Sequence, residues 1–217
     1  MNRLLSSKWT KVAVFALCLA PLANLVWRGF HNNLTADPIT FITHRTGDWT
    51  LRFLVITLAI TPLRKTLHVP QLIRFRRMFG LFAFFYVTLH FATWVVLDHF
   101  FAWSEMWKDV QKRPFITAGF IGFVLMIPLA VTSTAGWIRR LGGRRWQLLH
   151  RAIYLSAVLG VVHYYWQVKS DKRKPLEYAW MVGILLAWRL GAWLLHRARH
   201  GAAGSARPKE PVTAETS

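Results

Sequence analysis

Long apolar runs separated by short polar stretches recur along the whole chain. A helix that crosses a bilayer needs about 20 predominantly apolar residues. Six segments approach that length and composition: Val12–Trp27, Trp49–Leu63, Met78–Phe101, Phe115–Val131, Leu148–Trp166 and Leu176–Leu195. Because a helix satisfies its own backbone hydrogen bonds in lipid, the pattern predicts an all-α polytopic membrane helix bundle with about six transmembrane helices.

The polar ends of the chain divide it into three parts. We expect a short N-terminal segment over residues 1–11, a transmembrane domain over 12–196 and a tail over 197–217. The tail is rich in Ala, Gly, Ser, Pro and Thr, a composition typical of disorder. The first apolar run follows basic residues, as in a signal peptide. No A-x-A cleavage motif follows this run, whereas five further apolar runs do follow it. We therefore expect the first run to be retained as a transmembrane helix.

Basic residues indicate the orientation of these spans. The chain has 28 Lys and Arg against 9 Asp and Glu, a formal net charge of +19. Most of the loop cations lie in the N-terminal segment, in the loops after the second and fourth spans, and in the tail. Cytoplasmic loops carry the excess of Lys and Arg, so both termini are predicted to be cytoplasmic. A nucleic-acid-binding protein would gather its cations on one soluble face, so we expect a lipid bilayer and no nucleic acid as the surroundings.

Composition narrows the classes of protein and of site. Hydrophobic residues make up 54% of the chain and aromatic residues 15%, which argues against both a soluble domain and a disordered one. The single cysteine, Cys18, excludes an intrachain disulfide framework and a CxxC zinc site. It also excludes a cysteine-ligated iron–sulfur cluster and a CxxCH haem attachment.

Four histidines fall inside predicted spans, where ionisable groups are costly and often functional. His99 lies near the outer end of the third span, where we expect it in water or headgroups, and it is given no role. His90 lies in the third span, and His150 and His163 share the fifth, thirteen residues apart. That spacing is about 20 Å along a helix, too far for one zinc or copper cluster. Haem needs only one or two axial histidines, and small residues such as Gly119 would leave room for a porphyrin. Two alternatives stay open: histidines hydrogen-bonded to neighbouring helices, and a proton relay in a haem-free transporter or assembly factor.

A series of short motifs runs from the first span to the sixth and resembles the MsrQ family, within the ferric reductase-like transmembrane superfamily. In chain order the motifs are Thr35-Ala36-Asp37-Pro38, His44-Arg45-Thr46-Gly47, Ile60-Thr61-Pro62-Leu63, Arg76-Arg77-Met78-Phe79-Gly80-Leu81, Thr88-Leu89-His90, Lys112-Arg113-Pro114-Phe115, Thr132-Ser133, Trp146-Gln147-Leu148-Leu149-His150 and His163-Tyr164-Tyr165-Trp166. No single motif is decisive, but their order and spacing are specific.

The resemblance implies a membrane electron-transfer subunit in the bacterial cell inner membrane. Such a subunit binds haem b, and FMN is attributed to the family. It takes electrons from the quinone pool or from a cytoplasmic flavin reductase. It passes them to MsrP, a periplasmic molybdopterin subunit that reduces methionine sulfoxide in oxidised proteins. The chain itself would hold no sulfoxide-reducing site. A stand-alone ferric or oxygen reductase-like cytochrome b is the alternative, although no G-x-G-x-x-G motif for a nicotinamide domain is present.

The resemblance also assigns His90, His150 and His163 to cofactor binding. From their positions we predict that His90 and His163 are axial ligands of one haem iron in the outer half of the membrane. His150 is assigned to a second haem or to a quinone or flavin contact. Wider ferric reductase-like proteins carry two histidines on each of two helices, whereas Arg76 and Arg77 stand where the third span would need its second. A complete second pair of axial histidines is therefore not expected.

Overall fold

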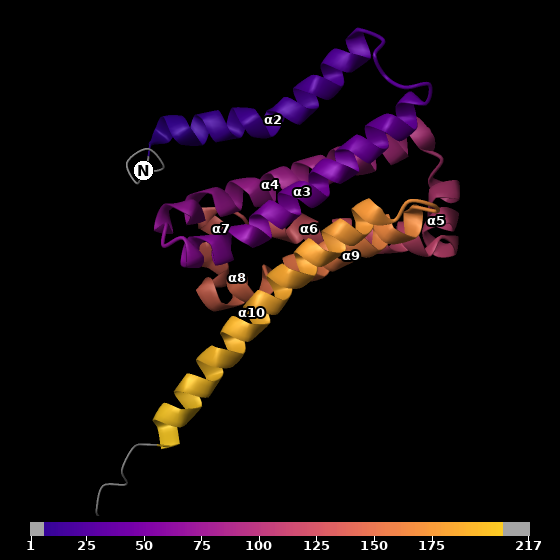
Figure 1. Ribbon diagram of the computed structural model, residues 1–217. Helices are drawn as coiled ribbons and strands as arrows, with labels where there is room; N and C mark the ends of the chain where they lie inside the picture. The colour runs from indigo at the N-terminus through magenta and orange to yellow at the C-terminus, as the bar shows by residue number, and fades with distance from the viewer. Residues whose placement is uncertain (1–6, 206–217) are drawn as a thin grey trace, which may run out of the picture.

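The computed structural model describes residues 7–205, with side chains as far as Ala198. Every regular element in that range is helical, which confirms the all-α expectation (Figure 1). In chain order the elements are α2 (Lys8–Phe30), α3 (Pro38–Thr66), η1 (Pro70–Leu72), α4 (Ile73–Thr93), η2 (Trp94–Asp98), α5 (Trp103–Lys112), α6 (Pro114–Val131), α7 (Ala135–Leu141), α8 (Gly143–Leu149), α9 (Ala152–Gln167) and α10 (Arg173–Ser205).

The long helices run back and forth between two ends of the bundle (Figure 1). One end holds α5 and the α2–α3 and α9–α10 connections, and we call it the α5 end. The other holds α7, α8 and the α3–α4 connection, and we call it the α7–α8 end. Within the bundle, α3 packs along α4 and α6 packs along α9.

In the described part of the chain, four helices are long and apolar enough to cross a membrane: Lys8–Phe30, Pro70–Asp98, Pro114–Val131 and Arg173–Ala198. They correspond to four of the six expected spans. The other two expected spans are also helices of the bundle, but they differ from the apolar pattern. The N-terminal half of α3 carries polar and charged side chains, which lower the mean hydropathy of this helix. The helix α9 has only 16 residues, since the chain turns at His150 and Arg151 and α9 begins at Ala152 rather than Leu148.

Polar groups inside the bundle are satisfied by the protein itself. The hydroxyls of Thr46, Thr50 and Thr57 each donate to the carbonyl four residues earlier in α3, so small polar residues pack against α4 without exposed donors. The carboxylate of Asp48 bonds Arg52, 2.7 Å away, and accepts from the Tyr178 hydroxyl at 2.6 Å. These bonds let α3 lie in the bundle despite its charges.

The hydroxyl of Tyr86 joins α4 to the outlying helix α2. It donates to the Cys18 carbonyl (2.9 Å) and accepts from the Leu22 amide (3.2 Å). A regular helix pairs this carbonyl and this amide directly, so the hydroxyl is inserted into the hydrogen-bond ladder of α2. Insertion of a side chain into the ladder bends a helix, and Pro21 lies beside the insertion. Tyr86 is only 1% exposed, which makes it the buried anchor of α2.

Arg189, in the apolar part of α10, has a structural partner in α3. Pro62 has no amide hydrogen, so the Leu58 carbonyl four residues earlier lacks its usual helical donor. The guanidinium of Arg189 donates to that carbonyl and to the Leu185 carbonyl of its own helix. The guanidinium also lies 5.2 Å from the centre of the Tyr154 ring. The arginine thus supplies the donor that the proline removes.

Replacing Arg189→Met should leave the Leu58 carbonyl unpaired in an apolar environment, at a cost of about 1–3 kcal/mol. We expect a lower midpoint of thermal unfolding for the detergent-solubilised protein. Pro62→Ala restores the amide donor, so the loss caused by Arg189→Met should shrink in the Pro62→Ala background. Equal losses in both backgrounds would contradict this role for Arg189.

Candidate functional site

His90 of α4 and His163 of α9 face each other near the α5 end. Their ring centroids are 5.9 Å apart and their planes are at 79°. The sequence predicted different depths in the membrane for the two histidines, but the tilt and packing of α4 and α9 bring the two rings to the same depth. Two imidazoles that ligate one metal from opposite sides have coordinating nitrogens about 4 Å apart, because each metal–nitrogen bond is about 2 Å. Each ring centre lies farther from the metal than its coordinating nitrogen does, so the distance of 5.9 Å between the ring centres is compatible with such a pair.

Each of the two rings is held through Nδ1 by a backbone carbonyl. His90 Nδ1 lies 2.9 Å from the Thr43 carbonyl of α3, and His163 Nδ1 lies 2.7 Å from the Phe115 carbonyl of α6. A carbonyl can only accept, so Nδ1 carries the proton and Nε2 keeps its lone pair. Histidines that ligate metals are commonly oriented in this way. Both rings are therefore prepared to coordinate through Nε2.

A glycine makes room for each ring at its carbonyl. Gly47 follows Thr43 by four residues, and Gly119 follows Phe115 by four. A Cβ atom at Gly119 would lie 2.7 Å from His163 Nδ1, and one at Gly47 would lie 3.1 Å from His90 Cε1. A contact as short as that at Gly119 is not tolerated in a close-packed interior, and that at Gly47 is tight enough to push the His90 ring aside. The same combination of a carbonyl and a glycine four residues later thus seats both histidines.

Threonines fix the backbone around His90. The Thr93 hydroxyl donates to the His90 carbonyl at 2.8 Å, and the Thr43 hydroxyl donates to Thr93 Oγ1 at 3.2 Å. The buried Thr46 hydroxyl lies 3.5 Å from His90 Nδ1. Directly after Thr93 the chain forms the π-helical turn η2, and such turns are frequent at functional sites. The position of His90 is therefore set by α3 as well as by α4.

The donor set fits haem better than a bare metal ion. Between residues 7 and 198 no cluster of three or more His, Cys, Asp or Glu could hold a metal ion. Zinc would require three or four protein ligands, whereas a porphyrin supplies four equatorial nitrogens and leaves only the axial positions to the protein. Two facing imidazoles with free Nε2 atoms meet that need.

His150 does not join this pair. It ends α8 at the α7–α8 end, in the turn before α9 rather than one turn into a span as the sequence suggested. Its ring stacks on Trp146 with centroids 3.8 Å apart, and its Nδ1 lies 3.1 Å from the Trp146 carbonyl. Trp146 in turn donates through Nε1 to the Thr132 carbonyl at 2.9 Å.

The other ring nitrogen of His150, Nε2, is buried and makes no hydrogen bond of normal geometry, although the Leu129 carbonyl approaches the ring. Thr61 Oγ1 and Gln71 Oε1 are likewise buried without a hydrogen bond. All three atoms lie toward the α7–α8 end, and they are the only such atoms among the described side chains. Buried polar atoms are normally paired, so this end of the bundle has unused capacity to bind a ligand.

Sequence reasoning did not identify every residue that shapes these sites. It noted Gly119 only as a small neighbour, and it gave no role to Gly47 or to the Thr43 and Phe115 carbonyls. Backbone acceptors carry no side-chain signal, and the glycines become meaningful only when the histidine packs against them. His99 was expected in water or headgroups. Its side chain is 13% exposed, with Nε2 3.5 Å from Asp109 Oδ2.

Comparison with known proteins gives the family. The profile described as "Ferric reductase like transmembrane component" matches residues 46–161, more than half of the chain. A relative from Caulobacter vibrioides is 51% identical over 82% of this chain and 84% of its own length. A relative from Herminiimonas arsenicoxydans is 51% identical over 90% of this chain and 91% of its own length. A relative from Ralstonia nicotianae is 48% identical over 94% of each chain. The chain belongs to the MsrQ family.

Each of these MsrQ relatives is named as the heme-binding subunit of protein-methionine-sulfoxide reductase. Membership in the MsrQ family confirms the resemblance found in the sequence. With its apolar helices, it makes the chain a multi-pass protein of the bacterial cell inner membrane. No solved structure matches the chain.

Gly119→Ala should destabilise the protein, because the new methyl group would overlap His163 and overpacking costs about 1–3 kcal/mol. We expect a lower midpoint of thermal unfolding by circular dichroism. Gly183→Ala is the matched control, since a Cβ atom there meets nothing within 4 Å. It should be neutral or should stabilise α10 by about 0.5–1 kcal/mol. Equal midpoints for Gly119→Ala and wild type would show that His163 does not need the glycine.

Proposed function

We propose that His90 and His163 are the axial ligands of a b-type haem and that the chain is the electron-transfer subunit of a methionine sulfoxide reductase. One observation carries the proposal: two imidazoles from different helices face each other with Nδ1 engaged and Nε2 free. The names of the MsrQ relatives, heme-binding subunits of protein-methionine-sulfoxide reductase, agree with it.

A haem bound there would supply a centre that gains and loses one electron at a time. The chain contributes the geometry around it. The Thr43 and Phe115 carbonyls keep the proton on each Nδ1, so both Nε2 atoms stay available as ligands. Hydrogen bonds of this kind also increase the basicity of the imidazole. Phe115, whose ring centroid lies 6.0 Å from that of His163, helps to exclude water.

We further propose that sulfoxide reduction takes place on a partner. The family resemblance indicates MsrP, the periplasmic molybdopterin subunit, and the word "subunit" in the relatives' names agrees with a multi-component system. In this scheme the chain delivers electrons at its α5 end, where the histidine pair lies, and holds no sulfoxide-reducing site of its own.

The electron donor is proposed to act at the α7–α8 end. Three buried polar atoms without a well-formed hydrogen bond, His150 Nε2, Thr61 Oγ1 and Gln71 Oε1, support the presence of a ligand at this end. A second haem, a quinone headgroup or a flavin could each supply the missing acceptor or donor. The quinone pool and a cytoplasmic flavin reductase are the donors that the resemblance implies, and FMN rests on that resemblance alone.

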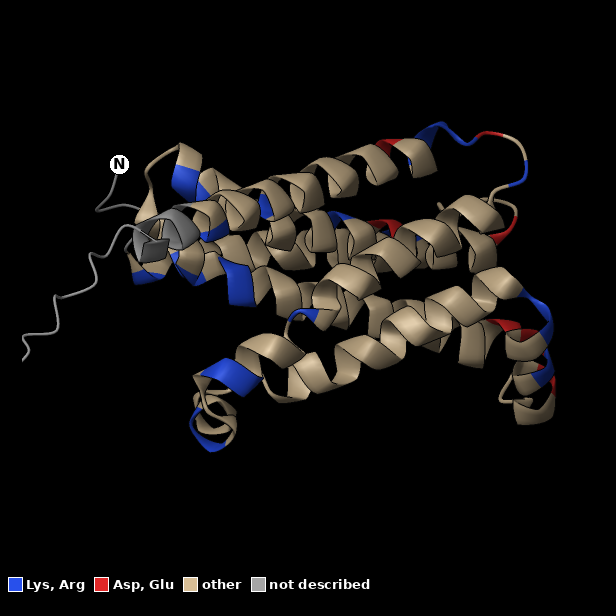
Figure 2. Ribbon diagram, turned by 90° about the horizontal axis from the view of Figure 1, so that it is seen from below, with Lys and Arg blue, Asp and Glu red and all other residues tan. Residues whose placement is uncertain are grey.

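Orientation follows from the distribution of charge. The described acidic residues all lie in the half of the bundle nearer the α5 end: Asp37, Asp48, Asp98, Glu105, Asp109, Asp171 and Glu177. Figure 2 shows Lys and Arg without acidic residues at the α7–α8 end. Because cytoplasmic loops are enriched in Lys and Arg, we place that end in the cytoplasm. The chain termini and the donor then lie inside, and the histidine pair lies toward the periplasm.

Haem content tests the central proposal. His90→Ala and His163→Ala should each abolish or strongly reduce the reducible Soret, α and β bands of the purified protein, because each removes an axial ligand. His44→Ala, which changes an exposed histidine of α3, should keep them. Full haem retention in both ligand variants would refute the assignment. A colourless wild-type protein would favour the haem-free transporter or assembly factor.

Fusions to the C-terminus test the orientation. If the α7–α8 end is cytoplasmic, an alkaline phosphatase fusion should be inactive and a green fluorescent protein fusion should be bright. The reverse pattern would overturn the charge argument and would invert the direction of electron flow.

His150→Ala tests the donor end. The spectrum of the haem held by His90 and His163 should be unchanged, whereas its reduction by quinol or by a flavin donor should slow, because the inner ligand loses a contact. His68→Ala, at the same end but on an exposed loop, is the control and should reduce at the wild-type rate. Normal reduction and normal sulfoxide repair in His150→Ala would leave His150 with a structural role only.

A further inference from the structure

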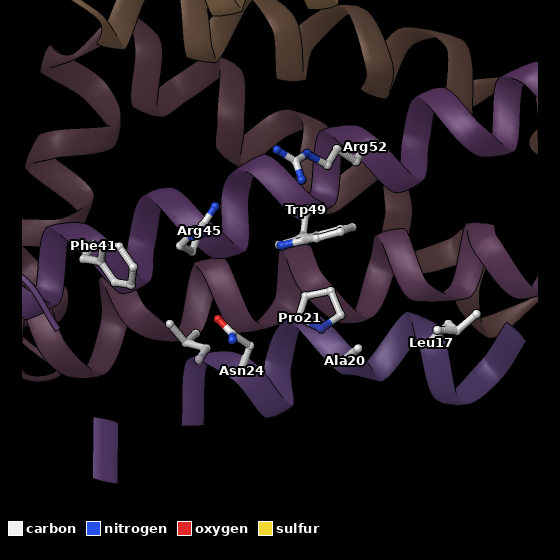
Figure 3. Close-up of a pocket in the computed structure, with 9 residues that line it drawn as sticks. Leu17, Ala20, Pro21, Asn24, Phe41, Arg45, Trp49 and Arg52 are labelled. Carbon is white, nitrogen blue, oxygen red and sulfur yellow. The ribbon is translucent and has the colours of Figure 1, made fainter. Parts of the chain in front are cut away.

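A groove lies between α2 and α3 (Figure 3). The cavity has a volume of about 350 Å³ and is lined by Pro21 and Asn24 of α2 and by Phe41, Arg45, Trp49 and Arg52 of α3. Most of the packing of α2 is against α4, through the Tyr86 hydroxyl and through Phe15, whose ring centroid is 5.1 Å from that of Phe82. The α3 side of α2 is therefore left open.

Two uncompensated cations lie at the mouth of this groove. The guanidinium carbons of Arg28 and Arg45 are 5.8 Å and 5.6 Å from the centre of the same ring, that of Phe41. Neither arginine forms an ion pair with any residue of the described part of the chain. Asp37, the nearest acid in sequence to Arg28, caps α3 by accepting from the Thr40 amide at 3.1 Å. Asp48, the nearest acid in sequence to Arg45, is paired with Arg52 at 2.7 Å.

Arg52, at the deeper end of the groove, provides the contrast. Its guanidinium is neutralised by Asp48 at 2.7 Å and lies 4.6 Å from the centre of the Trp49 ring. The deeper part of the groove is therefore charge-balanced, and Leu17 and Ala20 give it apolar walls. The unbalanced positive charge is confined to the mouth at the α5 end. A ligand that matches the groove has an anionic head and an apolar body.

We propose that the groove binds an anionic phospholipid, with its phosphate between Arg28 and Arg45 and an acyl chain along the walls of α2 and α3. Guanidinium groups bind phosphate through paired, charge-assisted hydrogen bonds. Basic pockets between transmembrane helices bind anionic lipid headgroups on the cytoplasmic side of membranes, and the same charge complementarity applies to a pocket at the α5 end. A net negative headgroup is favoured over a zwitterionic one because two cations, rather than one, face the site. The bound lipid fills the space between α2 and α3 and stabilises their packing.

The experiment uses the full chain in nanodiscs of phosphatidylcholine with increasing phosphatidylglycerol. Native mass spectrometry should detect phosphatidylglycerol retained on the protein in preference to phosphatidylcholine, and the midpoint of thermal unfolding should rise with its content. Arg45→Gln and Arg28→Gln should each weaken this retention about tenfold, the effect of losing one charged hydrogen bond. Arg45→Lys should keep most of it. Glycerol phosphate, which lacks acyl chains, should not compete.

Lys169→Gln is the matched control, since it removes one exposed positive charge from a loop at the same end and should leave retention unchanged. Equal retention of the two lipids, or equal loss in Lys169→Gln and Arg45→Gln, would overturn the proposal. Recovery of an isoprenoid quinone in place of phospholipid, lost in Arg45→Gln, would also overturn it and would assign the groove to quinone. None of these readouts depends on haem or on sulfoxide reduction.

Discussion

Inside a bilayer each polar atom must find its partner within the protein, and this requirement organises the whole bundle. The hydroxyls of the α3 threonines turn back to their own helix. Asp48 is enclosed by Arg52 and Tyr178, and Tyr86 completes the hydrogen-bond ladder of α2. The helices are thus joined by specific polar contacts as well as by apolar packing, which alone discriminates poorly between protein and lipid.

The candidate functional sites lie where the hydrogen-bond pairing of buried polar atoms is incomplete. His90 and His163 each use one ring nitrogen for a backbone carbonyl and leave the other free. Because the acceptors are backbone atoms four residues before a glycine, the two histidines are held by the shape of α3 and α6. The buried Nε2 of His150 is a second exception, at the opposite end. Two ends with unpaired ring nitrogens, on either side of the membrane core, are what the proposed electron-transfer role requires.

Much of this was predictable from the chain alone. The apolar periodicity predicted the helical class and the spans that became α2, α4, α6 and α10, and rarity of histidine in apolar runs drew attention to His90 and His163. The break between α8 and α9 was missed because Leu148–Trp166 is apolar almost throughout and contains neither proline nor a strong turn signal. The roles of Gly47 and of Arg189 were missed for a different reason. Gly47 matters because the His90 ring of another helix packs against it, and Arg189 matters because it donates to a backbone carbonyl of another helix. Such contacts leave no mark in the local sequence.

The bond between Arg189 and the Leu58 carbonyl has a consequence for biogenesis. The helices emerge in chain order, so α3 enters the membrane long before α10 is synthesised. Until then the carbonyl opposite Pro62 has no protein donor. During this interval water is the only donor left to the Leu58 carbonyl, because the helix itself offers none. Only insertion of the last helix completes the second one, which couples the two ends of the polypeptide into a single cooperative assembly step.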